Sequence, residues 1–170
     1  MAATYTAWVK NAVFAANKCM ISVFNGSSSP VIVKPYRIYA FNNQYVAVSG
    51  VLTNLEVRLL TSASGGTTIT AAPHDTSNTL NANVTCATNA TVTPSTLFRR
   101  VLWSTDEPAA NATMTVDEFQ CLLPFCNIWS MGYGDANVEP IVLNPNEGVG
   151  LINTGAVVGQ GDFAIEFTAA

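Results

Sequence analysis

Residues 162–168, DFAIEFT, carry the alternation that decides the fold of this chain. Phe163, Ile165 and Phe167 occupy every second position, and the residues between them are polar or small. This two-residue period is the one expected of a β-strand that turns one face toward a core and the other toward solvent. The stretch therefore predicts a half-buried strand in a sheet.

A second alternation lies within residues 45–61, YVAVSGVLTNLEVRLLT. Leu55, Val57 and Leu59 recur at every second position, so the end of this segment also has the period of a half-buried strand. Gly50 interrupts the segment and predicts a bend. The whole segment therefore predicts one long bent strand or two strands.

Turn signals separate further strand-like stretches. Ser64-Gly65-Gly66 predicts a tight hairpin turn with a return strand that begins at residues 67–70, and NPNEG at residues 144–148 predicts another turn. Residues 71–82 read as a polar loop. The other strand-like stretches are residues 31–41, 83–93, 97–104, 127–131, 140–143 and 149–153. Such spacing without a sustained helical period predicts an all-β chain, an antiparallel β-sandwich that is jelly-roll-like.

Residues 1–20 stand apart from this pattern and predict a short N-terminal arm ahead of a single sandwich domain at residues 21–170. Trp8, Val9, Val13 and Phe14 could form one side of a turn or two of helix, with alanines between them. An apolar arm must be buried, either on its own sandwich or on a neighbouring subunit, and the sequence leaves both alternatives open.

The composition excludes several classes of protein. Of the 170 residues, 49% are hydrophobic and only 11% are charged, so the chain is neither disordered nor a coiled coil. Seven cations against eleven acids give a net charge of −4, which argues against a nucleic-acid partner. The polar surface comes from neutral residues, among them 16 asparagines and 19 threonines. Such a surface repels neighbouring proteins weakly.

No leader or membrane-spanning segment is expected. The first 20 residues lack a charged region followed by a long apolar run, and apolar stretches such as residues 46–52 have the length of a strand. We therefore expect synthesis in a cytoplasm, with reduced thiols at Cys19, Cys86, Cys121 and Cys126.

The sequence predicts no catalytic residue, no cofactor and no metal. His74, the one histidine, precedes Asp75 in a loop, where neighbouring side chains rarely point together. Cys121 and Cys126 enclose the apolar run LLPF, which is typical of a packed core rather than of a zinc site. The acidic pairs Asp106-Glu107 and Asp117-Glu118, and Asp135 with Glu139, are interpreted as solvated carboxylates rather than as a glycosidase pair.

Arg99 and Arg100 lie inside the strand-like run LFRRVLWS. In a strand, successive side chains point to opposite faces, so one arginine is expected on each face of the sheet. A charged side chain on a sheet needs solvent, a carboxylate or a partner subunit. The sequence therefore leaves a structural ion pair and an interface contact as alternatives.

The C-terminal part of the chain resembles a known family. EPIVLNPNEGVGLIN at residues 139–153, followed by DFAIEF at residues 162–167, is similar to the closing hairpin of small β-sandwich proteins from tailed bacteriophages. YRIYAFNN at residues 36–43 fits the same pattern. The resemblance is to capsid decoration, or cement, proteins and related virion modules, and it implies a non-catalytic structural protein.

The favoured hypothesis is thus a decoration protein that binds the major capsid protein on the outside of a virion, as a homotrimer, after synthesis in the bacterial host cytoplasm. The alternative is a carbohydrate- or receptor-binding module of a phage tail or spike, with Trp129 and Tyr133 as ligand-contacting residues. A cupin-type enzyme is disfavoured because the chain has one histidine. The candidate partner or self-interaction residues are Trp8, Val13, Phe14, Arg99 and Arg100.

Overall fold

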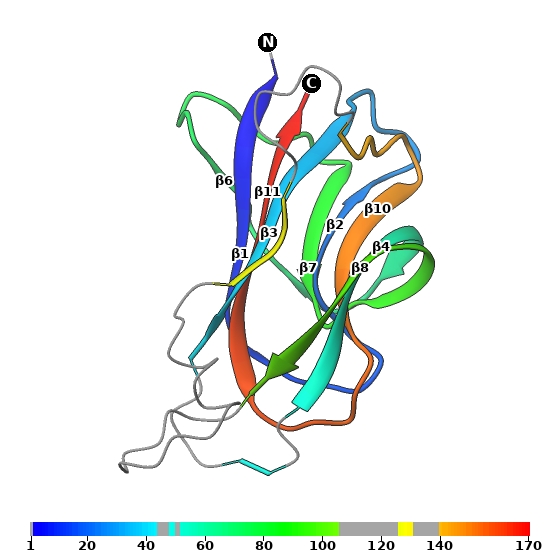
Figure 1. Cartoon of the computed structure of the whole chain (residues 1–170). Coiled ribbons are helices and arrows are strands. Elements are labelled where there is room, and N and C mark those ends of the chain that lie inside the picture. The colour runs from blue at the N-terminus through cyan, green and yellow to red at the C-terminus, as the bar shows by residue number, and fades with distance from the viewer. Residues whose placement is uncertain (1, 44–47, 50–51, 106–125, 131–139) are drawn as a thin grey trace.

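The structure is a computed structural model that describes residues 2–43, 48–49, 52–105, 126–130 and 140–170. These residues form an antiparallel β-sandwich and contain no helix (Figure 1). One sheet has five strands in the order β6-β1-β11-β3-β9, and the other has six in the order β5-β7-β2-β10-β4-β8. The predicted fold class is confirmed.

The chain crosses between the two sheets at each step from β1 to β4 and again from β8 to β11, in the manner of a jelly roll. The five-stranded sheet contains β1 (Ala3–Val13), β3 (Val33–Asn42), β6 (Ala72–Pro73), β9 (Cys126–Ser130) and β11 (Gln160–Ala169). The six-stranded sheet contains β2 (Cys19–Asn25), β4 (Leu52–Ser64), β5 (Thr67–Thr68), β7 (Val84–Thr88), β8 (Thr91–Ser104) and β10 (Glu147–Asn153).

The hydrophobic core lies between the sheets and follows the predicted alternation. Phe163, Ile165 and Phe167 on β11 are fully buried, as are Leu55 and Val57 on β4. The core from the opposite sheet also includes Ile21, Val23, Val149 and Leu151. Burial of each large side chain contributes about 2–3 kcal/mol, so the alternating strands account for most of the stability of the sandwich.

The expectation of an N-terminal arm with a turn or two of helix is wrong for residues 3–13, which form strand β1. β1 pairs with β11 along most of its length and with β6 at Tyr5 and Thr6. Tyr5, Ala7 and Val9 face the core. Small alanines at inward positions gave the segment its helical composition, but they also let the strand pack closely against the opposite sheet. The expected boundary at residue 20 falls inside β2.

Two expected hairpins are also wrong. The turn at Gly65-Gly66 exists, with φ of 63° and 79°, but the strand after it pairs with β7 and not with β4. Gly66 lies so close to the β7–β8 turn that a Cβ there would be 2.4 Å from the carbonyl oxygen of Thr88. β10 and β11 do not form a closing hairpin either, because they belong to different sheets.

The far end of the β4–β8 pair curls over the outer face of β2 and β10 (Figure 1). Three register shifts between Val57 and Ser62 produce the curl, since bulges bend and twist a strand. The curl buries a second small cluster, in which Leu60 packs with Cys19 and Ile152. Gly150 makes this possible, because a Cβ there would meet the Cys19 Sγ at 2.5 Å.

Two irregularities have a clear local cause. Pro35 lies at a register shift between β3 and β11, so the predicted edge or bulge is a bulge. Residues 83–93 contain the whole of β7 and the start of β8 rather than one strand, and Asn89 between them has a φ of 54°. Asparagine tolerates this left-handed conformation better than most residues. The expected bend at Gly50 lies outside the described residues.

Candidate binding surfaces

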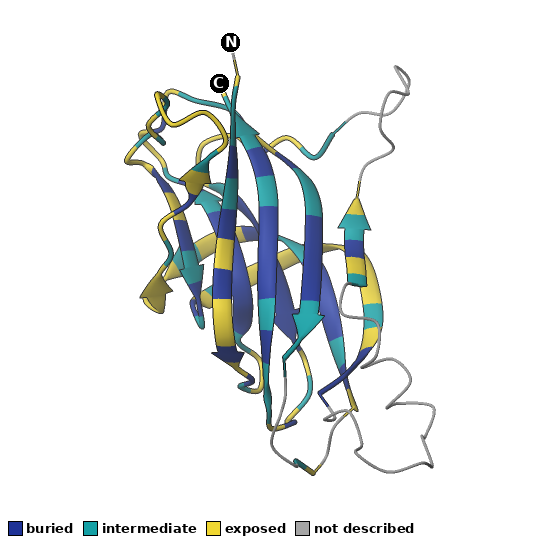
Figure 2. Cartoon of the chain, turned by 90° about the vertical axis from the view of Figure 1, so that its left-hand side faces the viewer, coloured by how far each residue is buried: buried dark blue, intermediate teal, exposed yellow. Residues whose placement is uncertain are grey.

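The outer face of the five-stranded sheet carries an ordered arrangement of side chains. β11 lies between β1 and β3, so each of its outward residues has a neighbour on at least one side. In order along β11, the cross-strand rows are Thr6–Glu166–Arg37, Trp8–Ala164–Tyr39 and Asp162–Phe41. We call these eight residues the aromatic face. Figure 2 turns this sheet toward the reader, and no described ribbon passes in front of β1, β11 and β3.

Three rings form the middle of the aromatic face. Trp8 stacks on Phe41 with ring centroids 5.3 Å apart and meets Tyr39 edge-on at 5.8 Å. Tyr39 and Phe41 are also in edge contact at 5.6 Å. Ala164 lies under these rings between β1 and β3, and its small side chain lets Trp8 reach across to the far strand. Trp8 retains 38% of its surface exposed, whereas Tyr39 is buried.

One side of the rings carries a charged row. A guanidinium nitrogen of Arg37 lies 3.4 Å from a carboxylate oxygen of Glu166. Thr6 and the Nε2 atom of His74 are hydrogen-bonded at 2.7 Å. The pKa of Tyr39 is raised, first by burial of its hydroxyl and then by the negative charge of Glu166, with Arg37 acting in the opposite direction.

The other side of the rings carries a carboxylate held by amides. The backbone N–H of Asn11 donates to Asp162 Oδ1 at 2.8 Å, and the side chain of Asn43 donates to the same oxygen. Asn43 also donates to Asn11 Oδ1 at 2.7 Å. Asn11 has a φ of 53° and lies in a bulge between Val9 and Ala12, which brings its backbone to Asp162.

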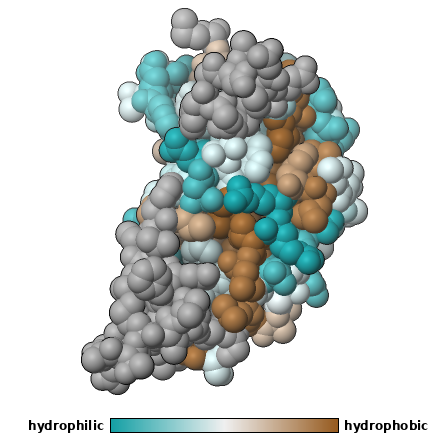
Figure 3. All heavy atoms as spheres, viewed as in Figure 1, coloured by the Kyte–Doolittle hydropathy of each residue, from teal (hydrophilic) through white to brown (hydrophobic). Residues whose placement is uncertain are grey.

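The outer face of β4 and β8 forms a second surface, which we call the leucine face: Leu52, Glu56, Arg58, Leu97, Arg100 and Leu102. Its three leucines are 45–56% exposed. Leu97 pairs with Arg58 across the strands, and Leu102 pairs with Asn54. On the side where β8 is in view, Figure 3 shows apolar surface broken by a hydrophilic band.

Glu56 is a buried carboxylate at the centre of the leucine face. Arg58 Nε donates to one of its oxygens at 2.6 Å, and Arg100 Nε donates to the other at 2.8 Å. Burial by itself raises the pKa of Glu56, but hydrogen bonds and positive charge from the two arginines outweigh it and leave the pKa below its ordinary value. A hollow of about 390 Å³ lies beside this group and extends to Asn17 and Thr154.

The residues expected to contact a partner lie in different places. Phe14 is buried and packs edge-on against Phe163 of its own core, while Val13 at the end of β1 is 61% exposed. Trp8 belongs to the aromatic face. Arg100 belongs to the leucine face and forms the ion pair that the sequence left open. Arg99 turns to the opposite side of β8. Burial raises the pKa of the Cys126 thiol, and the positive charge of Arg99 opposes this rise.

The structure separates the side chains of His74 and Asp75. His74 contacts Thr6, whereas Asp75 accepts hydrogen bonds from the backbone and hydroxyl of Ser77, which lower its pKa. Among the described residues, no group of three or more His, Cys, Asp or Glu side chains could hold a metal ion. The acidic pairs at residues 106–107 and 117–118, together with Asp135 and Glu139, lie outside the described residues.

The three described cysteines, Cys19, Cys86 and Cys126, are free thiols. Burial raises the pKa of Cys19 and of Cys86 to about 12, so both resist ionisation. The pKa of Cys126 is also raised, first by burial. Cys121 lies outside the described residues, as does Tyr133. Trp129, the other residue of the expected carbohydrate site, packs against the core instead.

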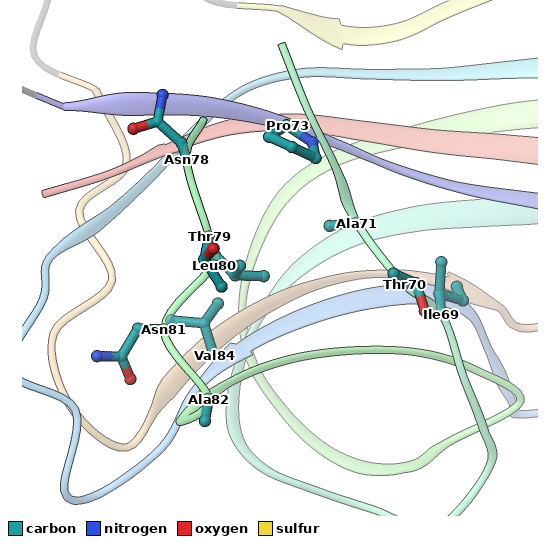
Figure 4. Close-up of a pocket in the computed structure, with 10 residues that line it drawn as sticks. All are labelled: Ile69, Thr70, Ala71, Pro73, Asn78, Thr79, Leu80, Asn81, Ala82 and Val84. Carbon is teal, nitrogen blue, oxygen red and sulfur yellow. The ribbon is translucent and has the colours of Figure 1, made fainter. Parts of the chain in front are cut away.

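A hollow of about 310 Å³ lies between residues 69–73 and residues 78–84. In Figure 4, Leu80 and Ala71 point toward the space between these two segments, and the amide of Asn81 points away from it. Thr70, Asn78 and Thr79 also line the hollow, so its wall is mixed in character, and Leu80 also packs against the main core. We interpret it as a shallow depression between two loops.

Comparison of the chain with family models, with curated proteins and with solved structures finds no match. No helix among the described residues is long and apolar enough to cross a membrane. The aromatic face and the leucine face are therefore interpreted from their own chemistry. The candidate residues from the sequence include one member of each face, Trp8 and Arg100. The other members of both faces were missed, because only the register between distant strands brings these side chains together.

Proposed function

We propose that this chain is a non-catalytic structural virion protein that binds the outside of a bacteriophage capsid shell as a decoration, or cement, protein. The leucine face carries this proposal. A single exposed leucine is ordinary, but Leu52, Leu97 and Leu102 share one face with Arg58 and Arg100. Arginine is enriched at protein–protein interfaces, and a group of exposed apolar side chains beside it is an area that a partner protein would remove from water.

The position of β8 supports the same function. β8 is the last strand of its sheet, and within the described ranges it pairs with β4 alone. Residues 93–100 are exposed along its length, so side chains on both of its faces are accessible. Edge strands of this length are normally covered in the assembled state, because their free backbone groups attract another chain. We propose that a subunit of the capsid shell covers the edge strand β8.

The charge of the chain fits a protein held among other proteins. With 11% charged residues and a polar surface made of asparagine and threonine, it repels neighbours weakly. We propose that three copies assemble at each docking site and contact the major capsid protein. Native mass spectrometry of the purified chain tests the trimer, and a monomer at all concentrations would contradict it.

Co-sedimentation with shells of the phage that encodes this chain tests the docking. Leu102→Glu places a charge on the leucine face at a position that is 56% exposed, so the fold is expected to survive. We expect shell affinity to fall about tenfold or more, as for truncation of an interface anchor. Val142→Glu is the matched control, since Val142 is 39% exposed and its neighbour Leu143 bridges to Val33 at the start of β3 in the other sheet.

The control variant is expected to bind as the wild type does. The proposal would be contradicted if Leu102→Glu sedimented with shells as well as the wild type, or if the wild-type chain did not sediment with them.

A further inference from the structure

We infer that the aromatic face binds a polysaccharide, with one pyranose ring against Trp8 and the hydroxyl groups of that ring and its neighbours in the chain at the two polar rows. This site lies on the opposite sheet from the leucine face, and it does not depend on shell binding. It also differs from the expected site at Trp129, which packs against the core.

Trp8 provides the exposed ring surface, and the half-buried Phe41 and the buried Tyr39 support it from below. The Trp8, Ala164 and Tyr39 row spans three adjacent strands, which is about 10 Å, and neighbouring rows are about 7 Å apart along the strands. Trp8 is 38% exposed although it contacts two other rings. The axial C–H groups of a pyranose carry partial positive charge, and the negative face of an indole attracts them.

The polar rows provide partners for hydroxyl groups. Asp162 Oδ1 is fixed by Asn11 and Asn43, and within the described ranges Oδ2 makes no hydrogen bond. A carboxylate held in this way is a preorganised acceptor for sugar hydroxyls, because its orientation needs no further ordering on binding. Across the rings, Glu166 with Arg37 provides both acceptors and donors one row from Trp8 and two rows, or about 14 Å, from Asp162. The two polar rows are therefore spaced for neighbouring sugar rings of one chain.

The charges argue against other flat ligands. Two carboxylates, Asp162 and Glu166, flank the rings, and Arg37 is already close to Glu166. A nucleotide would bring its phosphate next to these carboxylates, where repulsion disfavours binding. A protein partner is better served by the leucine face, which has exposed aliphatic side chains, whereas the outward positions of the three rows contain none larger than alanine.

Saturation-transfer NMR on the full chain tests the inference, with methyl β-glucopyranoside, methyl β-galactopyranoside and methyl N-acetyl-β-glucosaminide as probes and cyclohexanol as the non-sugar control. We expect at least one pyranoside to bind with millimolar affinity and to change tryptophan fluorescence. Trp8→Ala is expected to weaken binding about tenfold. Asp162→Asn is expected to weaken it several-fold, since the amide replaces an acceptor with a donor.

Val13→Ala is the matched control, because Val13 is an exposed apolar residue on the same strand and lies off the aromatic face. It should bind as the wild type does. Circular dichroism establishes that each variant is folded, and if Trp8→Ala is not, Asp162→Asn decides the outcome. The inference would be overturned if no pyranoside bound the wild type, if only cyclohexanol bound, or if a folded variant of Trp8 or Asp162 bound as tightly as the wild type.

Discussion

Glu56 and Arg100 lie directly opposite each other on β4 and β8, and Arg100 donates two hydrogen bonds to one oxygen of the buried carboxylate. Arg58 holds the other oxygen. The pair links the edge strand to the rest of the sheet through side chains as well as backbone. The leucine face is therefore built around a fixed charge cluster, and the three leucines are presented on a rigid strand pair rather than on a loop.

Replacing Glu56 is expected to change the pH dependence of stability. The pKa of Glu56 is lower in the folded chain than in the unfolded chain. The carboxylate therefore stabilises the fold above its unfolded pKa, and this contribution is lost as pH falls through the folded pKa. Glu56→Gln should lower the free energy of unfolding by about 2 kcal/mol at neutral pH, with a smaller difference in acid. Denaturant unfolding over a pH series measures both.

Arg99→Gln is the matched control for this experiment, because Arg99 is next to Arg100 but turns to the opposite side of the strand. It should leave the pH profile unchanged. If the difference in the free energy of unfolding between Glu56→Gln and wild type stayed constant from neutral to acid pH, the two arginines would not lower the pKa of Glu56 as described.

Deletion of residues 1–17 is expected to abolish the fold rather than only an interface. The deletion removes β1, which pairs with β11 and gives Tyr5, Ala7 and Val9 to the core, and it also removes Phe14. Loss of these buried side chains exceeds the usual stability of a domain. Far-ultraviolet circular dichroism of the truncated chain should show loss of the β spectrum. A truncated chain that kept this spectrum and a cooperative unfolding transition would show that β1 is dispensable.

A comparison of two phenylalanine variants distinguishes the buried core from the exposed edge strand. Phe167 is fully buried between the sheets, so Phe167→Ala should lower the free energy of unfolding by about 3–5 kcal/mol. Phe98 on β8 is 40% exposed, and Phe98→Ala should cost well under half as much. Chemical denaturation of both variants gives the comparison. Equal losses would mean that β8 is packed more tightly than the structure indicates.

The thiols should react in a fixed order. Cys19 and Cys86 are buried, with pKa values raised to about 12, whereas Cys126 is only partly buried. Because the thiolate is the reactive form, alkylation at neutral pH should reach Cys126 well before the other two. Mass spectrometry of peptides after a time course of iodoacetamide measures the order. Early labelling of Cys19 would contradict the burial of the cluster under the β4–β8 curl.

The strands with a regular period could be predicted from the sequence. Phe163, Ile165 and Phe167 lie on β11 where its register with β1 is continuous, so all three side chains face the core as the pattern indicates. β1 was missed because Trp8, Val9, Val13 and Phe14 could form one side of a helix that alanines such as Ala12 favour, and the bulge at Asn11 interrupts the alternation. The alternation of apolar residues predicts which face of the sheet a side chain lies on only where the strand register is continuous.

The candidate surfaces depend on pairing between distant segments, which local pattern does not contain. Trp8 and Tyr39 are 31 positions apart in sequence, and only their shared neighbour Ala164 on β11 brings them together. The Arg100 ion pair was one of two alternatives, and the register with Glu56 decides it. The Gly65-Gly66 turn does not close a hairpin, because the strand after it pairs with β7 and not with β4. Gly66 lies against the carbonyl oxygen of Thr88 at the end of β7, a contact that local sequence does not indicate.

Our central proposal is that this chain decorates the shell of a bacteriophage, and an electron cryomicroscopy reconstruction of virions from the source of this sequence tests that proposal most directly. We expect density for the β-sandwich on the outside of the shell, in groups of three, with β4 and β8 toward the capsid protein and Leu97 and Leu102 in the contact. Sandwich density that is absent from the shell, or that contacts it through the aromatic face while the leucine face is open to solvent, would contradict the account.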